Sequence, residues 1–138
     1  MAEFKLPKPL PAPSEDSKPF WDGCQRQELL IQKCDDCGFH RFPPSVLCPR
    51  CMSTNHQWVK VSGKAKIFSW QVTYQPFYPA WDTPYNVAIV ELDEGPRIHS
   101  NIIGCKNEDL YFDMPVEVVF EKVEDQEWFL PKFKPASK

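Results

Sequence analysis

The sequence CDDCGFHRFPPSVLCPRC, residues 34–51, contains two C-x-x-C pairs: Cys34 with Cys37, and Cys48 with Cys51. A gap of two residues lets a tight turn aim both sulfur atoms at one point. Two such turns facing each other place four thiolates about 2.3 Å from a zinc ion. A glycine follows the first pair and a proline lies inside the second, as chain-reversing turns require. The spacing therefore predicts a zinc ribbon with a tetrahedral metal site.

Other uses of the four cysteines are less consistent with the rest of the chain. Disulfides need an oxidising compartment, whereas the chain opens MAEFKLPKP, without the apolar stretch of a secretory signal, so we expect a reducing cytoplasm. A thioredoxin-type redox pair would stand singly at the start of a helix. Mononuclear iron remains an alternative to zinc, because it accepts the same four sulfurs. With all four ligands supplied by cysteine, the metal has no position for a catalytic water, so we expect it to be structural.

Composition narrows the class of protein. The 138 residues allow one ordinary domain or a small core with appendages, and the net charge of −3 provides no overall basic field for nucleic acid. No apolar run approaches the roughly 20 residues of a membrane span. The 15 prolines argue against a largely helical protein. Cys24 and Cys105, outside the two pairs, are interpreted as small buried side chains.

The chain divides into three predicted parts. Residues 1–27 form an extended proline-rich arm followed by a short helix, in which Ser17 is the expected cap and Phe20 and Trp21 contact two different surfaces. Residues 28–61 form the zinc ribbon, with strands at 28–33 and 56–60. The pattern in residues 62–138 predicts antiparallel β-structure.

Five strands are expected in this last part, at 66–74, 85–92, 97–103, 116–123 and 126–130. Turns at 93–96 and 124–125 connect two pairs of them as hairpins. The fold class is therefore mostly β: an N-terminal helix, a zinc ribbon and a five-stranded OB-type barrel, with an SH3-like barrel as the alternative.

Seven segments, taken in order, extend this interpretation to a family: FWDG (20–23), LLIQKCDDCG (29–38), FPPSVLCPRC (42–51), VSGKAKIFSW (61–70), PYNVAIVELDEGPR (84–97), MPVEVVF (114–120) and LPKFKP (130–135). Together they resemble the OB-fold, rubredoxin-like zinc-ribbon proteins that accompany thiolase-type enzymes of acyl-CoA metabolism. The chain departs from the family pattern at Ala65 and Asp113, where glycine is usual. Both differences concern the local backbone.

The resemblance implies a non-catalytic subunit that binds a thiolase-like protein and helps it to handle CoA thioesters. Our first choice within the family is the small subunit of benzoylsuccinyl-CoA thiolase, from the degradation of aromatic compounds. Relatives that bridge acetoacetyl-CoA thiolase and hydroxymethylglutaryl-CoA synthase, or that support steroid side-chain aldolases, are the alternatives.

The residues themselves agree with a binding role. A thiolase reaction needs an activated cysteine beside a histidine, but four cysteines are assigned to metal, and His40, His56 and His99 stand in separate contexts. We expect His40 and His56 to hydrogen-bond within the ribbon and His99 to be packed. Cations beside apolar side chains would suit the phosphates and pantetheine of CoA. The candidates are Arg97, Lys132, Phe133 and Lys134.

Two further expectations concern partners. The aromatic segment QPFYPAWDT, residues 75–83, is predicted to pack on the partner enzyme or to line the acyl-CoA entrance. A different class of function, single-stranded nucleic-acid binding, is the alternative, because zinc ribbons and OB barrels both serve it. The acidic balance of the chain argues against that alternative.

Overall fold

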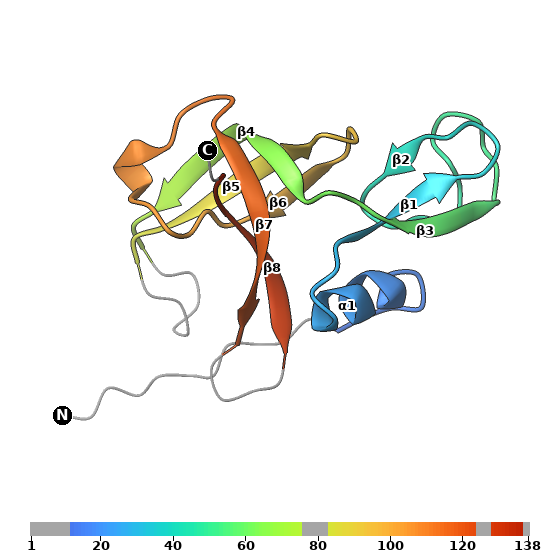
Figure 1. The fold of residues 1–138 in the computed structure, drawn as a ribbon, viewed down its shortest axis with the longest axis horizontal. Helices are drawn as coiled ribbons and strands as arrows, with labels where there is room; N and C mark the ends of the chain where they lie inside the picture. Colours follow the sequence, from blue (N-terminus) through green and yellow to red (C-terminus); the bar gives the residue numbers. More distant parts are fainter. Residues whose placement is uncertain (1–11, 76–82, 124–127, 137–138) are drawn as a thin grey trace.

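A computed structural model describes residues 12–75, 83–123 and 128–136. Figure 1 shows a small three-stranded ribbon beside a larger curled sheet, with one helix lying below the junction of the two. The predicted arm, residues 1–13, and the aromatic segment fall mostly outside the described residues. The mostly β architecture is confirmed.

The helix α1 (Lys18–Gln25) joins the two β units. On the ribbon side, the ring of the buried Phe20 lies 5.2 Å from that of Phe42. On the other side, Trp21 lies 6.4 Å from Trp128, and the amide of Gln25 exchanges hydrogen bonds with the backbone of Phe129. The prediction that Phe20 and Trp21 contact different surfaces is confirmed.

Ser17 occupies the N-cap position of α1 as expected, but its side chain does not cap the helix. Its hydroxyl makes no bond to the first turn of α1, and instead accepts a hydrogen bond from the backbone N–H of Ser14 at 2.9 Å. The two serines form a local turn that competes with a helix cap, as short hydroxyl side chains often do.

The ribbon consists of β1 (Leu30–Cys34), β2 (His40–Arg41) and β3 (His56–Lys60), in the order β2-β1-β3. Antiparallel pairing places Gln32 opposite both Arg41 and Trp58, and Cys34 opposite His56. This register brings the loop 42–49 back over the middle of the ribbon.

The larger sheet contains β4 (Lys64–Thr73), β5 (Tyr85–Leu92), β6 (Arg97–Ser100), β7 (Pro115–Lys122) and β8 (Phe129–Pro135), in the order β6-β5-β4-β7-β8. A short 3-10 turn, η1 (Asn107–Asp109), lies between β6 and β7. A parallel bridge between Ile102 and Phe133 brings the segment after β6 against β8, so the sheet curls towards closure as an OB fold does.

The last strand differs most from the expectation. We predicted it at 126–130, but β8 runs from Phe129 to Pro135 and includes two prolines. Prolines cannot donate a hydrogen bond to a ladder. They are tolerated here because β8 ends the strand order, where the side facing away from β7 has a single bridge, at Phe133, among the described residues. Phe133 can therefore enter the core, which is built from alternating residues of β4, β5 and β7.

Candidate functional site

The four predicted metal ligands converge. The sulfur atoms of Cys34, Cys37, Cys48 and Cys51 all lie within 4.8 Å of one another. Two of the sulfur pairs are 3.5 and 3.6 Å apart. Four thiolates at about 2.3 Å from a tetrahedral zinc would be about 3.8 Å apart, whereas a disulfide would require about 2.05 Å. The residues present fit a zinc ion.

Backbone N–H groups help to lower the pKa of two of the four thiols, Cys34 and Cys48. The N–H of Cys37 lowers the pKa of the Cys34 thiol. Burial raises the pKa of Cys48, but the N–H groups of Cys51 and Arg50 outweigh it, and the pKa falls to about 6. The N–H of Ser53 lowers the pKa of Cys51, but its contacts with the other three cysteines and burial outweigh this and raise that pKa to about 12. Deprotonation of all four thiols therefore depends on the bound cation.

A polar network supports the ribbon. The amide oxygen of Gln32 accepts hydrogen bonds from Nε of Arg41 at 3.0 Å and from the N–H of Ser45 at 2.8 Å. The amide nitrogen of Gln32 lies 3.3 Å from Nε2 of His56, whose Nδ1 lies 3.3 Å from the carbonyl of Thr54. The expectation that His56 bonds within the ribbon is confirmed. Gln32 and Arg41 are both buried although both are polar.

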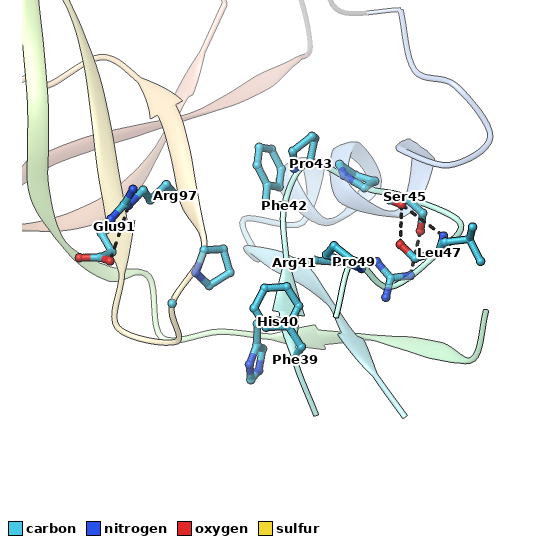
Figure 2. A pocket seen from close by; sticks show the side chains of 13 residues that line it. Phe39, His40, Arg41, Phe42, Pro43, Ser45, Leu47, Pro49, Glu91 and Arg97 are labelled. Carbon is cyan, nitrogen blue, oxygen red and sulfur yellow. Dashed lines mark hydrogen bonds and ion pairs between the residues drawn. The ribbon is translucent and has the colours of Figure 1, made fainter. Parts of the chain in front are cut away.

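A cleft of about 500 Å³ separates this network from the barrel. One wall is β2 with the loop that follows it, and the other is the turn between β5 and β6 (Figure 2). The rings of Phe39, Phe42 and Pro96 contribute apolar surface. Such a volume and composition are typical of small-molecule sites, which often lie between two structural units.

Arg41 is the unusual member of this cleft. Its side chain is 4% exposed, and its Nη2 donates to the carbonyl of Ser45 at 2.8 Å. Its Nη1 is buried without a hydrogen-bond partner among the described residues. The sequence contains little indication that Arg41 would be buried, beyond its place near two phenylalanines in FHRF. The burial of Arg41 depends on the pairing of β2 with β1.

The four residues predicted for CoA are not gathered at one place. Arg97 lines the cleft, where Glu91 is 3.7 Å away and the ring centroid of Phe68 is 3.8 Å away. Lys132 lines a separate hollow of about 350 Å³ and donates a hydrogen bond to the side-chain oxygen of Asn101.

Lys134 and Phe133 follow on the same strand. Lys134 forms an ion pair with Glu117 at 3.7 Å. Phe133 is fully buried in the core, so its ring supports the strand that carries the two lysines.

Two of the remaining expectations for titratable residues were wrong, those for Cys105 and His99. Cys24 is buried as expected, and burial raises the pKa of its thiol to about 12. Cys105 is only half-buried, and burial together with the charge of Asp109 raises its pKa. His99, expected to be packed, is exposed, because β6 turns it away from the core that Ile98 enters.

Residues 76–82 of the aromatic segment lie outside the described residues, so its predicted docking role stays a prediction. In the described ranges, no helix has the length and apolar character that a membrane span requires.

Comparison with family models covers most of the chain. Residues 21–57 match "ChsH2, rubredoxin-like zinc ribbon domain", and residues 58–121 match "ChsH2, C-terminal OB-fold domain". A solved structure described as "Ltp2-ChsH2(DUF35) aldolase" superposes with a TM-score of 0.85 at 34% identity, covering 93% of this chain and 100% of that one.

Curated relatives agree with these matches. A "Probable enoyl-CoA hydratase alpha subunit" of Thermomonospora curvata is 36% identical over 96% of this chain, which spans only 41% of that relative's length. A "DUF35 domain-containing scaffold protein" of Methanocaldococcus jannaschii is 38% identical over 73% of each chain. "Benzoylsuccinyl-CoA thiolase subunit BbsA" of Thauera aromatica is 26% identical over 74% of this chain and 65% of its own.

Proposed function

Because this chain belongs to the DUF35 family of ChsH2-type zinc-ribbon and OB-fold proteins, we propose that it is a non-catalytic scaffold subunit of an acyl-CoA enzyme. The observation that carries the proposal is the match to a named scaffold protein over 73% of both chains. Its relatives' names mention a hydratase subunit, a thiolase subunit and an aldolase, which supports a partner enzyme for this chain.

The thiols of the chain support a non-catalytic role. Four belong to the metal centre, which leaves only Cys24 and Cys105. Both have raised pKa values, and neither is hydrogen-bonded to a histidine among the described residues. A nucleophilic thiolate normally needs a lowered pKa or an adjacent base.

Exposed apolar side chains supply surface for a partner. Three lie on the ribbon, and others lie on the barrel, including two adjacent aromatic residues before β7. Exposed apolar groups that are contiguous commonly mark interfaces, and the ring of the exposed Phe112 lies 4.9 Å from that of Trp70. The exposed apolar side chains are Val46, Leu47 and Met52 on the ribbon, and Phe68, Tyr74, Tyr111 and Phe112 on the barrel.

We further propose that the partner is a thiolase-like enzyme and that CoA lies against the barrel. Arg97, Lys132 and Lys134 would approach its phosphates, while Phe133 acts through packing. The likeness to the BbsA subunit supports a thiolase, with cleavage or formation of a C–C bond beside a CoA thioester. The likeness to the Ltp2-ChsH2 structure supports an aldolase as the second candidate.

Co-expression with a thiolase-like protein tests the proposal. We expect a complex on size-exclusion chromatography, thiolysis or retro-aldol activity only when both chains are present, and loss of the complex in Phe112→Asp but not in His99→Asp. The isolated chain should not shift the anisotropy of labelled single-stranded DNA. Thioester turnover by this chain alone would contradict the proposal.

A further inference from the structure

One half of the long strand β4 is an open edge of the larger sheet. β4 pairs with β5 along nearly its whole length, but with β7 only at residues 64–66 (Figure 1). Ile67 continues the bonding on that side, since its N–H donates to the carbonyl of Met114 at 3.0 Å and its carbonyl accepts from the N–H of Asp113 at 2.8 Å. Beyond it, residues 68–73 have no ladder on the β7 side among the described residues.

The register shows which backbone groups this edge presents. In an antiparallel strand, alternate residues turn their N–H and C=O to opposite sides. The backbone of Leu92 bonds within the β5–β6 turn, so alternation directs the backbone groups of Ile89 and Val87 towards β4. The residues of β4 opposite these two are therefore bonded to β5. The residues that follow each of them, Trp70 and Val72, turn one donor and one acceptor each to the open side.

The open half of β4 lacks the features that usually protect an edge. Natural edge strands are short, or carry charges and prolines that block pairing with another chain. The other two edges of this sheet follow that rule: β6 has only four residues and includes Arg97, and β8 contains two prolines and two lysines. The sequence IFSWQVTY, residues 67–74, contains no charge, proline or glycine. Segments of this composition pair readily with other strands.

Exposed aromatic side chains accompany the open edge. Phe68 and Tyr74, near its two ends, are 42% and 72% exposed. Phe112 is 69% exposed, and its ring lies 4.9 Å from that of Trp70. A strand laid along the edge would cover apolar surface and bond the free backbone groups together. Only another extended polypeptide segment offers donors and acceptors at the matching spacing.

We propose that the open half of β4 pairs antiparallel with the same segment of a second copy of this chain, about a two-fold axis at Gln71. Trp70 then lies opposite Val72 of the second copy, and Val72 lies opposite Trp70 of the second copy. Each pair exchanges two N–H···O bonds, which gives four bonds across the axis. The two sheets become one continuous sheet, and the contact is closed, as in most homodimers.

The second copy is favoured because the edge is complementary to itself. In this register, one face carries two tryptophan–valine pairs, and the other carries a Gln71–Gln71 pair between two Ser69–Thr73 pairs. Aromatic–β-branched and hydroxyl pairs stabilise neighbouring strands, and no like charges meet. A contact of about six residues from each chain is small, so the dimer is weak and depends on concentration. The inference does not rest on the proposed scaffold function, because it concerns only copies of this chain.

Charge exchange at the axis tests the inference. Sedimentation equilibrium of the zinc-loaded full chain should show a mass that rises from one chain towards two as the concentration increases. Gln71→Lys and Gln71→Glu each place two like charges opposite one another, so either variant alone should dissociate at least about tenfold more readily. An equimolar mixture of the two variants should restore the dimer, because opposite charges then meet. Salt should reduce the difference between the variants.

The matched controls are Gln57→Lys and Gln57→Glu, since Gln57 is also an exposed strand glutamine but lies on the ribbon. They should leave the wild-type association unchanged. Val72→Pro removes an N–H from the open side alone, so it should fold and also weaken the dimer. Circular dichroism checks the fold of each variant.

Three results would overturn the inference. The first is a monomer at every concentration, whether the edge is covered by another segment of this chain or is left for an enzyme partner. The second is self-association that the charges at Gln71 do not alter. The third is assembly beyond the dimer, which a closed two-fold contact excludes.

Discussion

Gly63 stands at the junction between the ribbon and the barrel, and its replacement by alanine has a cost that the structure lets us estimate. The residue has φ of +79°, and its carbonyl accepts a hydrogen bond from the N–H of Val118 at 2.8 Å. A Cβ added there would lie 2.4 Å from Cγ1 of Val118. Two carbon atoms prefer about 3.5–4.0 Å, so the strand β7 would have to move.

Two penalties therefore add in Gly63→Ala. The left-handed backbone costs an alanine about 1–2 kcal/mol. Overpacking against Val118 costs about 1–3 kcal/mol more, so we expect the free energy of unfolding to fall by about 2–5 kcal/mol. Gly104→Ala is the matched control, because φ there is +81° but the nearest contact to an added Cβ is 3.6 Å. It should lose only the backbone penalty.

Urea unfolding of the zinc-loaded protein, followed by tryptophan fluorescence, measures both variants. The double variant Gly63→Ala with Val118→Ala removes the clashing methyl group and should show a favourable coupling of about 1–3 kcal/mol. Gly63→Ala no less stable than Gly104→Ala would refute the close approach of β7. Full stability of both variants would refute the backbone argument.

Three further outcomes are expected. Removing the metal with a chelator should release one zinc per chain, measured with a colorimetric indicator, and lower the thermal midpoint; an unchanged midpoint would contradict a structural metal. Gln32→Leu should cost about 1–3 kcal/mol for each orphaned donor of Arg41 and Ser45, whereas Gln57→Leu, exposed on β3, should be nearly neutral in the same urea assay. Cys24 should react with Ellman's reagent only after unfolding. Because its folded pKa of about 12 exceeds the ordinary thiol value of 9.0, the unfolded chain loses this proton first, so Cys24 should also lower stability as pH rises from about 9 to 12, an effect absent from Cys24→Ala.

The amino-acid sequence was sufficient for every feature that local spacing controls. Two C-x-x-C pairs in tight turns predicted the convergence of four sulfur atoms, and the strand expected at 85–92 has the bounds of β5. The interpretation failed where local rules compete. Ser17 bonds to Ser14 instead of capping α1, and two prolines are accommodated in β8 because that strand ends the sheet order.

Only the tertiary structure decided which segments, distant in sequence, lie opposite one another. Arg41 is buried because β2 pairs with β1 and Ser45 folds back over Gln32, and the cleft exists because the β5–β6 turn lies opposite that loop. Phe133 points inward because the segment at Ile102 bridges to β8 across 31 positions of the chain. These relations join segments distant in sequence, and no local spacing encodes them, because they follow from how the two β units pack.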